Sequence, residues 1–369
     1  MTRSARTAVG KKPALAVALL LAACLALPAQ GIAAGDHNPR PQQAHPIYWG
    51  AWIGSQLTGT APPANMSGVT AFEQLVGKGL SLVGFASPFA HCPPTPCSFY
   101  RFPVPGMENV RQYGAIPILN WGSESIPWIV ADPTQPEFQL SDVISGRYDE
   151  YIRRFALEAR AWGHPFFLRF DWEMNGNWFP WSEGVNGNKP GEFVAAWRHV
   201  HDIFNSVGAT NATWVWCPYA NGSKQGLHDL RALYPGHQYV NWACMDGYNW
   251  GTAPVNSHSW KSFGQIFSPT YERLTKRVAP GKPILLGEFA SSSYGGHKAL
   301  WIRNLLSELP TRFPRIRGLV WFDAVDRGID WPIETSATVT RAFSGAIRKR
   351  VYVGNRYSEL AASPINPQH

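Results

Sequence analysis

The chain has 369 residues, of which 45% are hydrophobic, 13% are aromatic and 16% are charged. A typical soluble domain is about 25% charged, so ionisable side chains are scarce here. This composition excludes a disordered chain, a coiled coil and a collagen-like repeat. The 17 Trp, 13 Tyr and 19 Phe are more than core packing alone explains.

The first 34 residues have the three-part layout of a secretory signal peptide. An apolar run at residues 14–27 follows a basic stretch and precedes small residues at 32–34. This run is too short to cross a bilayer as a stop-transfer helix. We therefore predict a signal peptide at residues 1–34, a mature domain at residues 35–369, and a secreted, extracellular or periplasmic protein. The basic residues of the leader are Arg3, Arg6, Lys11 and Lys12.

Removal of this leader changes what the net charge implies. The formal charge of the chain is +8, but without the four basic leader residues 29 Lys and Arg face 25 Asp and Glu. The remaining excess is scattered, so we expect no nucleic-acid partner. Residues 21–24 read LAAC, which matches the signature before a lipidated cysteine in bacterial lipoproteins. The residues after Cys24 stay apolar, which argues against lipidation. A lipid anchor at Cys24 is therefore the alternative to free secretion.

Eight short apolar runs follow the leader, and amphipathic stretches lie between them. Continuous apolar runs of this length are typical of strands that are buried on both faces. Eight strands alternating with helices predict a single (β/α)8 TIM barrel with enlarged loops, and a doubly wound open sheet is the alternative. The runs are residues 47–53, 80–86, 115–121, 166–170, 213–217, 239–245, 283–289 and 318–322. Helix-like stretches include 147–162, 191–207, 271–278 and 298–313.

Four cysteines remain after the leader, and an exported chain can form disulfides. Cys92 and Cys97 are separated by four residues, three of them proline, in one loop, so we predict that they are joined. Cys217 and Cys244 lie on the fifth and sixth predicted strands, which are neighbours in a barrel, and they either pair or remain buried thiols. No metal-ligand spacing fits these cysteines.

Aromatic and acidic residues collect at the C-terminal ends of the predicted strands. Active sites of (β/α)8 barrels lie at this end. Aromatic faces suit the apolar faces of sugars, and glycoside hydrolysis uses two carboxyl groups. The pattern therefore predicts a sugar-cleaving site around Glu173 and Glu288. The strand-end residues are Trp49, Trp52, Ser87, Asn120, Trp121, Asp171, Trp172, Glu173, Trp216, Asp246, Tyr248, Glu288 and Trp321.

The sequence around two of these strands resembles family 26 of the glycoside hydrolases, which is best known for β-mannanases. Residues 167–178 read FLRFDWEMNGNW, residues 283–289 read PILLGEF, and VWFD and DWPI follow at 320–323 and 330–333. The resemblance implies a barrel whose general acid/base follows strand four and whose nucleophile follows strand seven. By position, Glu173 matches the acid/base and Glu288 the nucleophile of a retaining glycosidase. Strand alternation places Arg169, Asp171 and Glu173 on one face, where Arg169 would help to keep a neighbouring carboxylate ionised.

The resemblance also implies a set of substrate contacts. Tyr248 would hydrogen-bond the nucleophile, Trp321 would be the platform beneath the sugar, and Trp178 a second stacking wall. The family usually has His before the acid/base and an apolar residue before that, whereas this chain has Asp171 and Trp172. An indole donates one hydrogen bond and accepts none, so this departure bears on which sugar is bound. The predicted substrate-binding residues are Arg169, Trp121, Trp172, Asn175, Trp178, Tyr248, Trp321 and Trp331.

These observations predict an exported, retaining endo-β-glycanase that works without a cofactor or a metal ion. The family resemblance favours β-1,4-mannan as the substrate, and mixed-linkage or other β-glucans are the second choice because of Trp172. A catalytically silent carbohydrate-binding barrel is an alternative of another class, but such a protein has no use for two convergent carboxyl groups. We expect a monomer without a membrane span, whose partner is the polysaccharide.

Overall fold

The structure is a computed structural model that describes residues 45–92, 95–127, 133–220, 229–255, 258–354, 357–360 and 362–367. Residues 43–369 form one unit. The predicted signal peptide and the alternative lipid anchor at Cys24 lie outside the described residues. None of the described helices is both long and apolar enough to cross a membrane.

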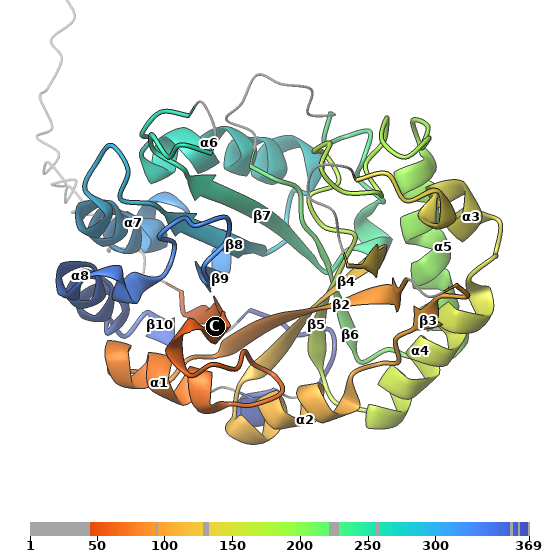
Figure 1. Ribbon diagram of the computed structural model, residues 1–369, viewed down its shortest axis with the longest axis horizontal. Coiled ribbons are helices and arrows are strands. Elements are labelled where there is room, and N and C mark those ends of the chain that lie inside the picture. Colours follow the sequence, from red (N-terminus) through yellow and green to blue (C-terminus); the bar gives the residue numbers. More distant parts are fainter. Residues whose placement is uncertain are drawn as a thin grey trace, which may run out of the picture. The chain divides into compact units, whose positions relative to one another are not determined.

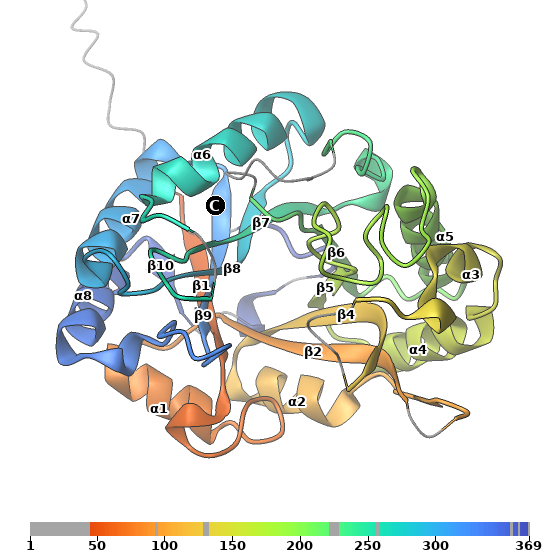
Figure 2. The same cartoon turned by 45° about the horizontal axis from the view of Figure 1, so that its top comes forward.

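Eight parallel strands close into a barrel, as the sequence predicts (Figure 1). Each strand pairs with its neighbours in the ring, and the pairing of the first with both the second and the last closes it. Figure 2 shows the first and last barrel strands side by side. The barrel strands are β1 (Ile47–Ile53), β2 (Leu82–His91), β4 (Ile116–Ile126), β5 (Phe166–Phe170), β6 (Ala212–Trp216), β7 (Trp242–Asn249), β8 (Ile284–Ser291) and β9 (Ile316–Asp323).

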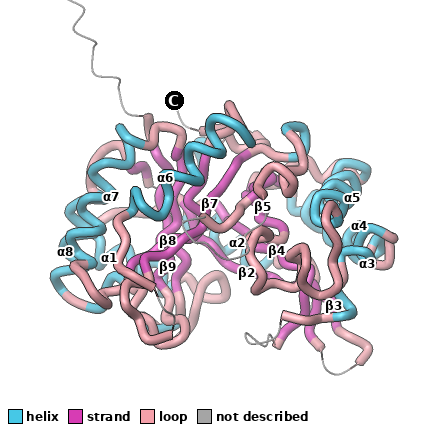
Figure 3. The backbone as a smooth tube through the Cα atoms, turned by 90° about the horizontal axis from the view of Figure 1, so that it is seen from above, coloured by secondary structure: helices cyan, strands magenta, loops and turns pink. Residues whose placement is uncertain are grey.

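Helices surround the barrel, and the strands occupy the interior (Figure 3). Gly114 and Gly163 end the helices before β4 and β5 with left-handed φ angles of 95° and 76°, which cost glycine little. The helices are α1 (Ser67–Val76), α2 (Val104–Tyr113), α3 (Leu140–Ile144), α4 (Asp149–Trp162), α5 (Glu192–Ser206), α6 (Phe263–Arg273), α7 (Lys298–Arg312) and α8 (Ala337–Ile347). Leu274–Val278 extends α6 as a π-helix. Two short strands flank the barrel, β3 (Ser98–Phe99) on β2 and β10 (Tyr352–Val353) on β1.

Many of the tryptophans fill the layer between barrel and helices, and this corrects two predictions. Trp121 is fully buried and stacks on Phe155 of α4 with ring centroids 4.2 Å apart. Trp321 is also fully buried and packs against Phe343 of α8 at 5.4 Å. Successive residues of a strand face opposite sides, and Asn120, beside Trp121, points into the barrel. Trp121 and Trp321 therefore belong to the core and cannot stack on a sugar in the cleft.

Both cysteine pairs are joined by disulfides. Cys92–Cys97 closes the loop after β2, which confirms the prediction for this pair. Cys217–Cys244 links the residue after β6 to β7, so the pairing alternative holds rather than the thiol alternative. The first disulfide lies in a partly exposed loop, whereas both cysteines of the second are fully buried.

Candidate active site

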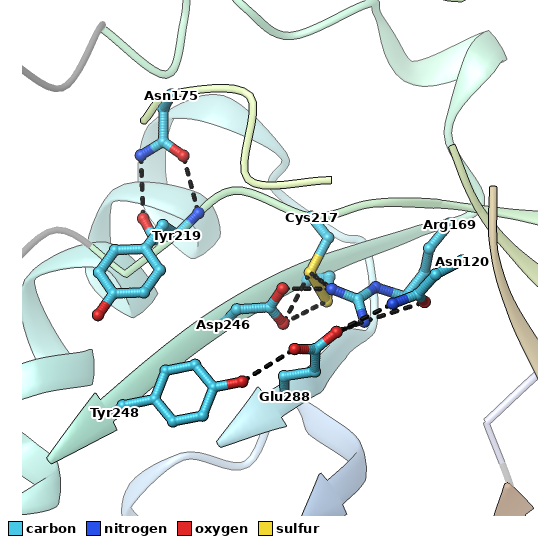
Figure 4. Close-up of a disulfide and its surroundings, with 9 residues drawn as sticks. Asn120, Arg169, Asn175, Cys217, Tyr219, Asp246, Tyr248 and Glu288 are labelled. Carbon is cyan, nitrogen blue, oxygen red and sulfur yellow. Dashed lines mark hydrogen bonds and ion pairs between the residues drawn. A yellow bond between two sulfur atoms is a disulfide. The ribbon is translucent and has the colours of Figure 1, made fainter. Parts of the chain in front are cut away.

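Three strands supply hydrogen-bond donors to the carboxylate of Glu288 on β8 (Figure 4). One oxygen, Oε1, accepts from Nδ2 of Asn120 and from Nη1 of Arg169, each at 2.9 Å. The other oxygen, Oε2, accepts from the hydroxyl of Tyr248 at 2.9 Å. With only 8% of its surface exposed, Glu288 is held in one orientation by groups from β4, β5 and β7. A carboxylate fixed in this way suits a nucleophile, because its charge is stabilised and its direction is set.

Arg169 is the cation at the centre of this network. Its side chain is 1% exposed and forms ion pairs with Glu288 and with the fully buried Asp246. A buried ion pair is stable only when its members are well paired and hydrogen-bonded. Asp246 therefore has a clear role, since it balances the charge of Arg169 and fixes the guanidinium that in turn holds Glu288.

Glu173 is placed by a left-handed turn rather than by strand alternation, which corrects the sequence reasoning. Strand β5 ends at Phe170, and Asp171 and Glu173 have φ angles of 41° and 53°. The carboxylate of Asp171 turns away to accept from the N–H and the hydroxyl of Ser123, at 2.7 and 2.8 Å. Non-glycine residues in this region cost about 1–3 kcal/mol each and cluster at functional sites. The turn aims Glu173 into the barrel mouth and leaves Asp171 in a structural role.

Two further contacts fix Glu173. Its backbone N–H donates to the carbonyl of Cys217 at 2.7 Å, and its Oε2 accepts from the indole N–H of Trp178 at 2.6 Å. Burial, together with the negative charge of Glu288, raises the pKa of Glu173 to about 8. Burial and the charge of Glu288 also raise the pKa of Tyr248 well above its usual value. The phenol therefore stays protonated and donates a hydrogen bond to Glu288.

The two glutamates lie close together. One carboxylate oxygen from each of Glu173, Asp246 and Glu288 lies within 4.8 Å of the other two. Three such oxygens could surround a metal ion in principle, but Arg169 already supplies positive charge to Asp246 and Glu288. The arrangement instead combines Glu173, whose pKa is raised to about 8, with Glu288, whose carboxylate accepts three hydrogen bonds.

Several predicted substrate contacts have other roles. Asn175 is fully buried, and its amide pairs with the backbone N–H and carbonyl of Tyr219 at 2.7 and 3.0 Å. Trp331 is 1% exposed and packs against the rings of Tyr248 and Trp250 at 5.1 and 4.9 Å. Asn175 and Trp331 therefore support residues of the cleft and do not face it.

Trp172 and Trp178 are less deeply buried than Asn175 and Trp331. Trp172 is 9% exposed and packs edge-on against Phe179, at 5.1 Å. Trp178 is half-buried, contacts Glu173, and packs at 5.2 Å on Tyr219. Trp178 can therefore act on the acid/base candidate directly as well as line the site.

The sequence of the central segment matches a known family. Residues 147–289, which carry Arg169, Glu173, Tyr248 and Glu288, match the sequence model of Glycosyl hydrolase family 26. Over 302 residues, the chain is 34% identical to Endoglucanase H of Acetivibrio thermocellus, a match that covers 81% of this chain. The segment from 147 to 289 belongs to glycosyl hydrolase family 26. The chain is also 25% identical over 162 residues to a mannan endo-1,4-beta-mannosidase of Bacillus subtilis.

These alignments cover only parts of the relatives. The chain spans 30% of the length of Endoglucanase H, and the alignment to the mannosidase covers 42% of this chain and 43% of that relative. Among solved structures, the mannanase BCman of Bacillus subtilis superposes with a TM-score of 0.60 at 16% identity, covering 89% of this chain and 92% of that one. This likeness shows a shared fold.

Sequence reasoning about this chain did not assign Asn120 and Asp246 to the site. Both stood among the strand-end residues, but the signal that would identify them is a shared partner, and partners appear only in the folded chain. One aromatic residue at the rim, Phe322, was also unassigned. Phe322 lies between Trp52 and Tyr248, at 6.4 and 5.6 Å. It occupies the inward position of β9 that we had assigned to Trp321.

Proposed function

We propose that the chain is a retaining endo-β-glycanase in which Glu173 is the acid/base and Glu288 is the nucleophile. The observation that carries this proposal is the pair of carboxylates within 4.8 Å. Retaining glycosidases have carboxyl groups about 5–5.5 Å apart, whereas inverting enzymes need about 6.5–9.5 Å to fit a water molecule. The pKa of Glu173 is raised to about 8, which suits a proton donor, and the three donors on Glu288 fix the direction of its carboxylate, which suits a nucleophile.

In the first step, Glu288 attacks the anomeric carbon as the glycosidic bond breaks, and Glu173 gives its proton to the departing oxygen. This forms a covalent glycosyl-enzyme and leaves Glu173 ionised. In the second step, Glu173 takes a proton from water, and the water oxygen displaces Glu288 from the anomeric carbon. Arg169, Asn120 and Tyr248 stabilise the carboxylate of Glu288 each time it is released.

We place β-glucan first among substrates and β-1,4-mannan second. The relative named an endoglucanase aligns with 81% of this chain at 34% identity, and the relative named a mannosidase with 42% at 25%. Trp172 occupies the position next to the acid/base, where its indole cannot accept a hydrogen bond from a sugar hydroxyl. A site built around one hydroxyl configuration discriminates strongly against the other. The family resemblance and the mannosidase relative support mannan as the second candidate.

Export is part of the same proposal. The leader-like pattern at residues 1–34 supports it, and so do the two disulfides, because disulfides persist mainly in oxidising compartments.

Purified protein incubated with a panel of β-glucans and β-mannans tests the activity, with released oligosaccharides as the readout. Glu288→Ala should abolish turnover on every substrate. Glu173→Ala should lose at least about 10²–10⁴-fold on polymer but still react with an activated aryl glycoside, and azide should restore its turnover. Glu183→Ala is the matched control, because Glu183 is a buried glutamate whose carboxylate accepts from the backbone N–H of Gly191.

Three results would overturn the proposal. Azide rescue of the Glu288 variant with retained stereochemistry would reverse the two roles. Unchanged activity of both variants would remove the site. Binding without any hydrolysis by the unaltered protein would favour a silent carbohydrate-binding barrel.

A further inference from the structure

The Cys217–Cys244 disulfide lies where the barrel ladder is shortest. Strands β6 and β7 are paired in register at only two positions, Val215 with Trp242 and Trp216 with Ala243. The next backbone bridge joins Tyr219 to Asp246. Between these contacts, the disulfide is the direct link from one strand to the other (Figure 4). The covalent bond therefore joins β6 to β7 at the positions where their ladder pairing is interrupted.

This disulfide contacts the charged network beneath Glu288. The sulfur of Cys217 lies 3.3 Å from Nη2 of Arg169 and 3.2 Å from Oδ1 of Asp246. The sulfur of Cys244 lies 3.9 Å from the same carboxylate oxygen. Nη2 of Arg169 donates to the sulfur of Cys217, whereas the contacts with Asp246 are packing contacts, because a disulfide sulfur carries no proton to donate. The packing is tight, because a Cβ at Gly287 would lie 2.6 Å from the Cys244 sulfur and 2.9 Å from Cζ of Arg169.

The same bond also reaches the acid/base candidate. The carbonyl of Cys217 accepts the backbone hydrogen bond of Glu173, and Asp246 lies two residues beyond Cys244 on β7. One end of the cross-link thus anchors the turn that carries Glu173. The other end anchors the carboxylate that fixes Arg169, which in turn fixes Glu288.

We infer that the Cys217–Cys244 disulfide is a positioning group that sets the placement of Glu173 relative to Glu288, an inference that rests on the proposed function. It acts through Arg169, Asp246 and the backbone of Glu173, and it does not touch the reacting atoms. Misplacement of catalytic groups by about 1 Å can cost about 10²-fold in rate. Loss of the cross-link should therefore lower kcat by roughly 10- to 100-fold, with a smaller effect on KM.

The pH profile separates this role from a purely structural one. Burial is the largest influence on the pKa of Glu173; Glu288 also raises it, and Trp178, Arg169 and Arg327 lower it. Asp246 faces Glu173 as well, with a carboxylate oxygen within 4.8 Å. If the contact between β6 and β7 loosens when the disulfide is lost, water enters and reduces the burial that raises the pKa of Glu173. The alkaline limb of kcat/KM, which follows deprotonation of the acid, should then move to lower pH.

The experiment compares two double variants of the full chain, Cys217→Ala/Cys244→Ala and Cys92→Ala/Cys97→Ala. Each removes one disulfide, but the second pair lies in the loop after β2 and, within the described part of the chain, does not bond to the carboxylates. We expect the first variant to lose kcat and to shift its alkaline limb, and the second to keep the profile of the unaltered enzyme. Thermal unfolding of both variants measures the stability that each bond contributes.

Reduction provides the measurement if the first variant does not fold. In the Cys92→Ala/Cys97→Ala protein, a reductant that yields two additional thiols per folded chain should produce the same loss of kcat and the same shift of the limb. An unchanged kcat and pH profile, in the folded variant or in the reduced protein, would overturn the inference even if the melting temperature falls. Failure of the unaltered protein to cleave any glycan would instead refute the proposed function.

Discussion

Replacement of Trp178 by Phe should raise the pH at which the enzyme loses activity on its alkaline side. The indole N–H donates to Oε2 of Glu173 at 2.6 Å, and Glu173 is only 7% exposed. Phe keeps a flat ring next to Tyr219 and removes the donor together with one of the two indole rings. Hydrogen bonds to charged groups contribute about 1.5–3 kcal/mol and those to neutral groups about 0.5–1.5 kcal/mol. The ionised form of Glu173 therefore loses about 1 kcal/mol more than the protonated form.

That difference converts directly into a pKa shift. At 1.36 kcal/mol per unit, a loss of about 1 kcal/mol raises the pKa of Glu173 by about 0.7 units. The starting value is about 8, because burial and the charge of Glu288 already favour the protonated acid. Removal of a bond to the charged form shifts the value further upward. The acid then keeps its proton to higher pH, and the alkaline limb of kcat/KM moves up by about 0.7 units.

Initial rates on a soluble polysaccharide across the alkaline range measure this shift. Trp250→Phe is the matched control, because its indole N–H donates to the hydroxyl of Tyr219 at 3.4 Å and not to a carboxylate. The control should leave the position of the limb unchanged. A limb that stays in place or moves down in Trp178→Phe would show that this hydrogen bond does not stabilise the ionised acid, and the assignment of Glu173 would lose its electrostatic basis.

Three further changes probe the supports of the site. Tyr248→Phe removes the 2.9 Å donor to Glu288, and since such a bond is worth about 1.5–3 kcal/mol, kcat should fall about 10- to 150-fold; an unchanged kcat in steady-state assays would deny the phenol a role. Gly287→Ala would place a methyl group 2.6 Å from a disulfide sulfur, and overpacking of this kind should lower the free energy of unfolding by about 1–3 kcal/mol in urea titrations, so equal stability would mean that the core can relax there. Lys298→Met removes the donor to three consecutive backbone carbonyls at 330–332; the stability should fall by about 1–3 kcal/mol, and a melting temperature at or above that of the unaltered protein would show that the desolvated charge costs more than its hydrogen bonds contribute.

The barrel could be predicted because strands buried on both faces leave continuous apolar runs. Strands β1 and β5 have the predicted bounds. Other strands run beyond the predicted ends, β4 to Ile126 and β7 to Asn249. The added residues are largely polar, because they approach the barrel mouth and bind other polar groups there. A strand predicted from hydropathy therefore ends too early, before the polar residues that carry function.

The two glutamates could be predicted because a motif and a strand end coincide at each. The orientation of neighbouring side chains could not. At Asn120 and Trp121, alternation requires one to face inward, but the sequence does not say which. Asp171 and Glu173 have a left-handed backbone although neither is glycine, so the sequence does not indicate this turn. Roles that depend on a partner, such as that of Asp246, follow only from the three-dimensional arrangement.

The placement of the tryptophans has an optical consequence. Of the sixteen that the structure describes, eleven are buried, and several of these lie between the barrel strands and the outer helices. Their emission should be blue-shifted in the folded protein and move to longer wavelength when the helices separate from the barrel. Iodide in solution should quench only the minority of indoles that water reaches, among them Trp52 and Trp178. Intrinsic fluorescence of this chain will thus record unfolding with a large signal, whereas an oligosaccharide entering the cleft will change it little.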